Sequence, residues 1–138
     1  MSDVVNMKVV GVGGAGNNVV SRMRSSGLDG VTYVNINTDR PTLVASAADE
    51  RVQIGEKLTH GQRAGSKPEV GRMAAEEDRN NILRVFENTD AVFLTAGMGG
   101  GTGTGAAPVI AKVSKDMGIL TVGIVTIPFR FEGNKKID

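Results

Sequence analysis

The feature that most constrains this chain is a run of nine residues that holds six glycines, Gly97 to Gly105. It follows an apolar, β-branched stretch and precedes a helical pattern. Ordering such a run costs about 1 kcal/mol or more of chain entropy per residue, so a plain connector would contain fewer glycines. Glycine allows consecutive backbone N–H groups to face one side, and the hydroxyls of Thr102 and Thr104 add further donors. The run therefore predicts an anion-binding loop at the start of a helix.

A second glycine segment, GVGGAGNN from Gly11 to Asn18, occupies the same kind of place between an apolar run and a helical pattern. Its glycines at 11, 13 and 16 match G-x-G-x-x-G, in which backbone N–H groups approach a phosphate at a helix start. Taken alone, this pattern suits NAD binding or a tight structural turn as well as any other phosphate site. Neither segment contains the Lys of a Walker A loop.

Five apolar runs rich in β-branched residues predict strands, and three longer stretches have helical spacing. The strands are expected at Met7–Val12, Val31–Ile36, Arg51–Ile54, Ala91–Thr95 and Ile119–Ile127, and the helices at Ala15–Ser25, Pro68–Asn88 and Thr104–Met117. Strands that alternate with helices predict an α/β fold, a three-layer, doubly wound parallel sheet of Rossmann-like order 3-2-1-4-5. Residues 1–138 are expected to form one domain that is incomplete at its carboxyl-terminal end.

In that strand order the first and fourth strands are neighbours, and each is followed by one of the glycine segments. Because both segments leave the carboxyl ends of adjacent strands, they are expected to face one crevice. A dinucleotide site uses one such loop for its pyrophosphate. Two loops favour a longer chain of phosphates, as in a nucleoside triphosphate.

Composition excludes several other classes of function. The chain has no Cys and one His, which excludes disulfides, thiolate catalysis and Cys-based zinc sites and argues against a Ser-His-Asp triad. A net charge of +1 and few aromatic residues give no reason to expect a nucleic-acid partner. No apolar run approaches the roughly 18 residues of a membrane span, and the start does not resemble a signal peptide. A cytoplasmic location is expected.

The glycine segments and several further motifs resemble the FtsZ branch of the tubulin superfamily. GMGGGTGTGAAPVIAK is similar to the superfamily signature, and GVGGAGNN, Asn37-Thr38-Asp39, IGEKLT with AGSKPEVG, and TVGIVTIPFRFEG follow in matching order. The resemblance extends from about Lys8 to Asp138. It implies a GTP- and GDP-binding domain with Mg²⁺ held by phosphates and water.

The resemblance also implies which residues contact the nucleotide. The first segment would contribute Gly14, Ala15, Gly16, Asn17 and Asn18, with Asn18 reaching toward guanine. The second segment would bind phosphates through Gly100, Gly101, Thr102, Gly103 and Thr104. Glu132 would accept hydrogen bonds from the ribose hydroxyls, and Thr126 and Pro128 would shape that wall. Lys136 stands where bacterial FtsZ has an Arg, so the charge is kept without the guanidinium fork.

Three further positions are expected near the γ-phosphate and the metal. They are Asp39, Ala64 and Gly65. From the residues alone, Asp39 has two other interpretations: the ribose-binding acid of a Rossmann fold, or a helix cap before Pro41. In the same loop the chain has Gln62-Arg63 where FtsZ proteins commonly have Leu-Gly.

The resemblance implies a polymerising GTPase of bacterial cell division, a cytoskeletal protein that acts in septation at mid-cell. Its partners would be further copies of itself, head to tail in a filament, and other cell-division proteins. In this family hydrolysis needs an acidic loop from the neighbouring subunit, so no catalytic residue is expected here and the chain alone is expected to be inactive. The alternative is a Rossmann-type NAD-binding oxidoreductase domain, which leaves the second glycine segment unexplained.

Overall fold

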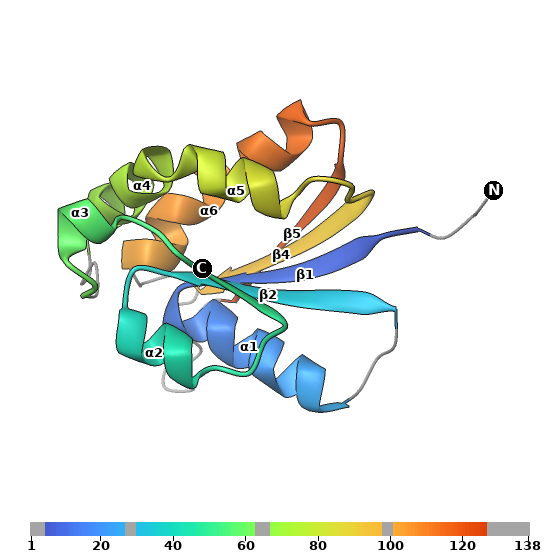
Figure 1. Ribbon diagram of the computed structural model, residues 1–138, viewed down its shortest axis with the longest axis horizontal. Helices are drawn as coiled ribbons and strands as arrows, with labels where there is room; N and C mark the ends of the chain where they lie inside the picture. Colours follow the sequence, from blue (N-terminus) through green and yellow to red (C-terminus); the bar gives the residue numbers. More distant parts are fainter. Residues whose placement is uncertain (1–4, 27–29, 63–66, 98–100, 127–138) are drawn as a thin grey trace, which may run out of the picture.

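The computed structural model describes residues 5–26, 30–62, 67–97 and 101–126 and contains a five-stranded parallel sheet (Figure 1). The strand order is β3-β2-β1-β4-β5, with every neighbouring pair parallel, which confirms the predicted topology. The strands are β1 Met7–Val12, β2 Val31–Asn37, β3 Glu50–Gln53, β4 Ala91–Gly97 and β5 Leu120–Thr126.

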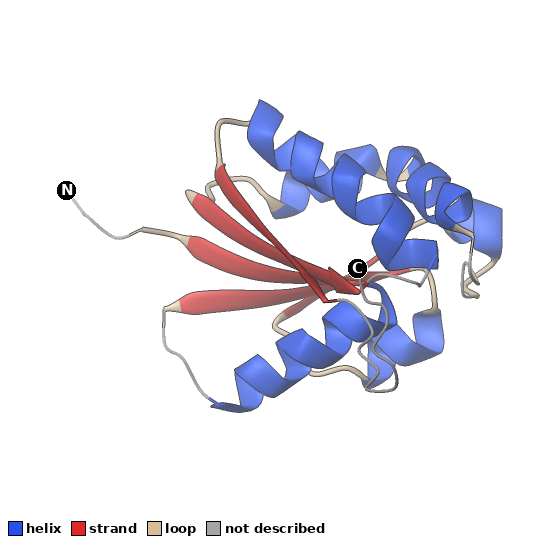
Figure 2. Ribbon diagram, turned by 180° about the vertical axis from the view of Figure 1, so that it is seen from behind, coloured by secondary structure: helices blue, strands red, loops and turns tan. Residues whose placement is uncertain are grey.

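Helices cover both faces of the sheet. They are α1 Gly13–Ser26, α2 Arg40–Ala45, α3 Glu56–Thr59, α4 Pro68–Glu77, α5 Arg79–Val85 and α6 Gly101–Asp116. Figure 1 shows α1 and α2 on one face and α4, α5 and α6 on the other, and Figure 2 shows the same three layers from behind. The short helix α3 was not expected from the sequence, and α2 corresponds to the interpretation of Asp39 as a helix cap.

The prediction of one continuous helix from Pro68 to Asn88 is wrong, because the helix is interrupted at Asp78. The backbone of Asp78 leaves helical geometry with φ −110° and ψ 30°. Its carboxylate accepts hydrogen bonds from the Gly55 backbone N–H at 2.7 Å and from Asn81 Nδ2 at 3.0 Å. A short acidic side chain that binds the backbone of another segment competes with helix formation at its own position, and α5 begins at the next residue.

The side chains of the central strands alternate between two apolar layers. Val10 and Val12 of β1 point into the larger cluster, under α4, α5 and α6. Val9 points to the opposite face, where it packs with Val20 of α1 and Tyr33 of β2. Burial on both faces explains why these strands have continuous apolar sequences, as is typical of parallel sheets.

Candidate functional site

The carboxyl ends of β1 and β4 lie side by side, since Val12 pairs with Ala96 in a parallel register. Helix α1 begins at Gly13, directly after β1, and α6 begins at Gly101, shortly after β4. Both helices start earlier than their apolar patterns predicted, so glycines of each segment form the first helical turn. The amino ends of two helices therefore meet at one edge of the sheet.

The two glycine segments touch through their backbones. A Cβ atom on Gly13 would lie 2.9 Å from the Gly103 backbone nitrogen, and Gly13 has a φ of +78°. A Cβ atom on Gly103 would lie 3.2 Å from the carbonyl oxygen of Val12. A side chain at Gly13 would be strained by the positive φ and by this contact, and one at Gly103 would press on the backbone of β1. This contact places the two segments side by side at the carboxyl ends of β1 and β4.

The first two turns of α1 have an exposed side and a buried side. Gly14, Ala15 and Asn18 are exposed, and among the described residues no atom lies within 4 Å of the place where a Cβ of Gly14 would stand. Gly16 is buried, with the Thr95 carbonyl oxygen only 2.5 Å from its Cβ position. The open surface over Gly14 is the space that a ligand of this helix end could occupy.

The side chain of Asn17 is directed inward and is 1 % exposed. Its Nδ2 donates to the Gly11 carbonyl oxygen at 2.9 Å, and its Oδ1 accepts a hydrogen bond from Asn37 Nδ2 at 3.0 Å. These bonds join α1 to the ends of β1 and β2. The two adjacent asparagines therefore differ in role. The Asn17 side chain stabilises the fold through these buried hydrogen bonds, whereas Asn18 is exposed.

The first turn of α6 carries two threonines with different surroundings. Thr102 is buried, and its Oγ1 lies 3.1 Å from Thr38 Oγ1 in a hydrogen bond in which either hydroxyl could be the donor. The Oγ1 of Thr104 is buried and has no hydrogen-bond partner among the described residues. An unpaired buried hydroxyl is costly, so this one suits a polar ligand at the helix start.

Two glycines bring α4 close to the start of α6. A Cβ on Gly71 would lie 2.8 Å from Thr102 Cα, and a Cβ on Gly105 would lie 2.7 Å from the Arg72 backbone nitrogen. The amino end of α4, at Pro68, consequently packs against the second glycine segment.

Asp39 lies at the turn between β2 and α2 and caps α2. Its Oδ2 accepts a hydrogen bond from Thr42 Oγ1 at 2.8 Å, and its Oδ1 accepts one from the Thr42 backbone N–H at 3.4 Å. The helix cap before Pro41, one of the three interpretations of the sequence, is therefore present. Residues of the same turn also contact both glycine segments, since Asn37 binds Asn17 and Thr38 binds Thr102.

These contacts of Asn37 and Thr38 are the part of the site that the sequence reasoning missed. The available signal was three polar residues directly after a buried strand and before a proline. Several predicted site residues lie outside the described residues, namely Gly100, Pro128, Glu132, Lys136, Ala64 and Gly65. Thr126 is the last residue of β5.

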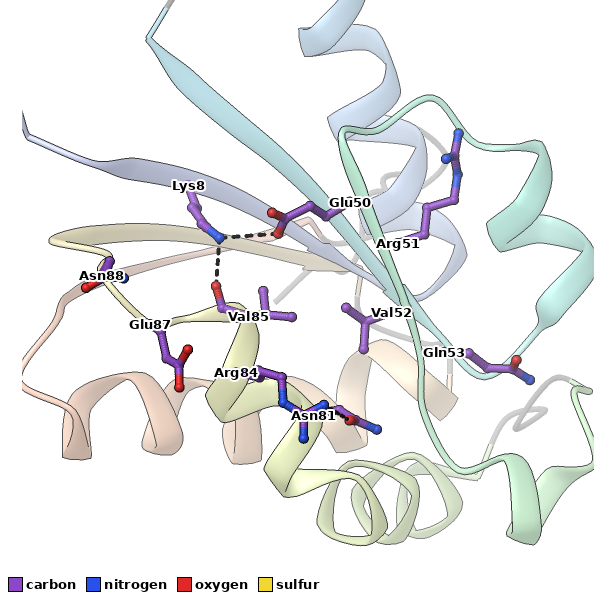
Figure 3. Close-up of a pocket in the computed structure, with 10 residues that line it drawn as sticks. All are labelled: Lys8, Glu50, Arg51, Val52, Gln53, Asn81, Arg84, Val85, Glu87 and Asn88. Atoms are coloured by element: carbon purple, nitrogen blue, oxygen red, sulfur yellow. Dashed lines mark hydrogen bonds and ion pairs between the residues drawn. The ribbon is translucent and has the colours of Figure 1, made fainter.

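The described residues also contain a groove of about 620 Å³ between β3 and α5 (Figure 3). None of its lining residues belongs to either glycine segment. Lys8 crosses it, and its Nζ donates to Glu50 Oε1 at 3.2 Å and to the Val85 carbonyl oxygen at 2.7 Å. The lysine thereby binds a carbonyl group at the carboxyl end of α5, where a cation is favourable. This groove is separate from the predicted site.

Within the described part of the chain, no group of three or more His, Cys, Asp or Glu side chains could hold a metal ion. The same part contains no helix with the length and apolar character needed to cross a membrane.

Residues 6–138 match the family model described as "Tubulin/FtsZ family, GTPase domain". The solved structure "FtsZ dimer, empty" from M. jannaschii is 48% identical to the chain with a TM-score of 0.88, over 91% of this chain and 36% of that chain. The W319Y mutant of the same FtsZ has the same identity and TM-score and is covered over 38% of its length.

A more distant relative is CetZ2 from Haloferax volcanii, described as a "GTPgS bound protofilament". It is 27% identical with a TM-score of 0.78, over 88% of this chain and 39% of that chain. The chain thus spans less than two fifths of the length of each of these three relatives.

Proposed function

The chain belongs to the tubulin/FtsZ family, whose GTPase domain it matches, and from this premise we propose that it binds GTP and GDP as part of a filament-forming GTPase of bacterial cell division. The single observation that supports the proposal most is the backbone contact between Gly13 and Gly103. It brings the amino ends of α1 and α6 together. Free N–H groups and the positive ends of two helix dipoles then converge on one small region, which suits a chain of phosphates.

The residues around the crevice fit a polyphosphate. The Thr104 hydroxyl, which has no partner among the described residues, can donate to a phosphate oxygen, and the open space over Gly14 allows close approach to the backbone of α1. The amides of Gly101, Thr102 and Gly103 would bind the same phosphates as those of Ala15 and Gly16. Backbone donors of this kind bind an anion without a lysine side chain.

Recognition of the nucleoside follows from the family resemblance. Asn18 would reach toward guanine, Glu132 would bind the ribose hydroxyls beside Thr126 and Pro128, and Lys136 would lie near the sugar and phosphates. Asp39, Ala64, Gly65 and Gly100 would complete the phosphate end. Mg²⁺, when bound, supplies charge neutralisation on the phosphate oxygens, with its remaining ligands being water.

Filament formation and hydrolysis are proposed on the same basis. One related structure is described as an FtsZ dimer and another as a protofilament, which supports self-association for this chain too. A neighbouring subunit would contribute the acidic loop that positions and activates water, and this chain's glycine segments would hold the phosphates in place for the attack. The protein would act at the division site, together with other cell-division proteins.

Ligand-dependent thermal unfolding tests the nucleotide proposal. A ligand that binds only the folded state at a hundredfold excess over its Kd adds about 2.7 kcal/mol, so GDP or GTP with Mg²⁺ should raise the Tm by about 5 °C or more. NAD should give no rise. Thr104→Val is the matched variant, since it removes an unpaired hydroxyl and should reduce the GDP effect without lowering the Tm of the free protein.

The opposite ligand preference would support the alternative, an NAD-binding oxidoreductase domain. That alternative explains the G-x-G-x-x-G pattern at Gly11, Gly13 and Gly16. It gives no role to the second glycine segment or to its contact with the first. A rise in Tm with NAD and none with either guanine nucleotide would therefore refute the GTP proposal.

A further inference from the structure

The hydrogen bond between Thr38 and Thr102 joins two hydroxyls that the fold hides from solvent. Thr38 is 0% exposed and Thr102 is 6% exposed, and their Oγ1 atoms are 3.1 Å apart. Thr102 lies in the first turn of α6, within the second glycine segment. Thr38 lies in the turn that follows β2 and has no assigned contact with a nucleotide.

The Thr38 and Thr102 hydroxyls together have two hydrogens to donate, which limits the ways in which they can bind both each other and an anion. A threonine hydroxyl has one hydrogen and two acceptor lone pairs. A phosphate oxygen only accepts, so Thr102 must donate to it if the two are to bond. The bond between the threonines then has one possible direction, with Thr38 donating to Thr102 Oγ1.

We propose that Thr38 is a positioning residue of the phosphate site, which donates to Thr102 Oγ1 and thereby directs the Thr102 hydrogen toward a bound phosphate oxygen. The inference rests on the nucleotide function proposed above and assigns a role to a residue outside both glycine segments. When one hydroxyl donates to a second, the two hydrogen bonds of the chain polarise each other. The Thr102 hydroxyl is then a stronger donor to the phosphate than an isolated hydroxyl would be.

The turn around Thr38 is held by one internal hydrogen bond and by bonds to two other segments, which give the hydroxyl a defined position. Asn37 Nδ2 donates to Asn17 Oδ1 at 3.0 Å, and the Asp39 backbone N–H donates to Asn37 Oδ1 at 3.1 Å. The Arg40 backbone N–H donates to the Gly61 carbonyl oxygen at 3.0 Å. A donor that is already ordered loses little conformational entropy when the ligand binds.

Binding of GDP with Mg²⁺, measured by calorimetry, tests the role of Thr38 directly. Thr38→Val keeps the shape and removes the hydroxyl, and loss of one hydrogen bond of ordinary strength predicts about 3- to 10-fold weaker binding. Thr38→Ser restores the hydroxyl and should return affinity to within about twofold of the parent chain. Thr121→Val is the matched control, because it also removes one hydroxyl of a hydrogen-bonded pair, Ser114 Oγ and Thr121 Oγ1 at 2.7 Å, near the amino end of β5 and away from both glycine segments.

A double-mutant cycle separates positioning from a general effect on the fold. On a Thr102→Val background, Thr38→Val should change GDP affinity by less than about twofold, since Thr38 acts through Thr102. The ³¹P NMR signals of bound GDP supply a second readout, which should shift in Thr38→Val and return in Thr38→Ser. Should Thr38→Val not fold, Thr38→Ala takes its place in the same cycle.

Each outcome decides between the two proposals. Thr38→Val that binds GDP as the parent does, with unchanged ³¹P signals, overturns the positioning role alone. Equal weakening in Thr38→Ser and Thr38→Val also overturns it, because packing and not the hydroxyl would then matter. A parent chain that binds NAD but no GDP refutes the nucleotide proposal, and the role of Thr38 with it.

Discussion

Gly13 and Gly103 lie 90 positions apart in the chain, yet a Cβ atom on Gly13 would stand 2.9 Å from the Gly103 nitrogen. The contact exists because β1 and β4 are adjacent and parallel, so the residues that follow them leave the sheet together. Close approach of two backbones at one point is what allows amides from two helices to face a single ligand.

Gly13 and the neighbouring Gly14 should respond to alanine in opposite ways. Gly13→Ala places a Cβ at a positive φ and against Gly103, and we expect it to lower the free energy of unfolding by about 1–3 kcal/mol. Gly14→Ala meets no atom within 4 Å, so stability should be kept while GDP binding weakens, because the methyl group enters the ligand space. Urea unfolding and GDP calorimetry on both variants check this. Equal loss of stability in the two variants would contradict it.

Asn17 and Asn18 form a second matched pair. Asn17→Ala removes a buried amide that binds Gly11 and Asn37, and it should cost about 1–3 kcal/mol of stability. Asn18→Ala changes an exposed residue, so the free energy of unfolding should stay within about 0.5 kcal/mol. Its expected effect is reduced preference for GDP over ADP, measured by competition. An unchanged preference for GDP over ADP would show that Asn18 does not contact guanine.

Asp49 should contribute to acid sensitivity. A hydrogen bond from the Tyr33 backbone N–H, together with the nearby Arg24 guanidinium, holds the pKa of its carboxyl below the usual 3.8. Because the pKa is lower in the folded state, ionised Asp49 stabilises the fold above about pH 4. This stabilisation is lost as the pH falls through the pKa of the folded state. Asp49→Asn should therefore lower the Tm at neutral pH and flatten its decline below pH 4. If the Tm of Asp49→Asn and that of the parent protein fall equally below pH 4, Asp49 does not have this role.

The apolar side chains of β5 should promote association. Leu120, Val122 and Ile124 are 67%, 39% and 49% exposed, and their register places them in the same rows as Ala91, Phe93 and Thr95 of β4. An exposed apolar row on an edge strand favours contact with another chain. Ile124→Lys should thus reduce light scattering at high protein concentration and leave the Tm unchanged. The control is Val44→Lys on α2, which is similarly exposed and should not reduce scattering.

Much of the fold was predictable because its signals are local. Each strand was located to within a few residues by its apolar, β-branched composition, and the alternation with helices predicted the parallel order. The break at Asp78 was not predictable, since the partner of its carboxylate, Gly55, lies 23 residues away. The same applies to Asp39, where the sequence permits a cap, a ribose ligand or a metal-side residue, and the structure contains the cap.

The sequence by itself determined the five strands, the helices after the two glycine segments and those segments themselves, because hydrophobic periodicity and backbone freedom are properties of neighbouring residues. Only the tertiary structure decided which side chains meet: that Asn17 faces inward and Asn18 outward, and that Thr38 reaches Thr102 across 64 positions. Such pairings depend on the pairing of strands and on the packing of helices upon them. They follow from distances in space that no local pattern contains.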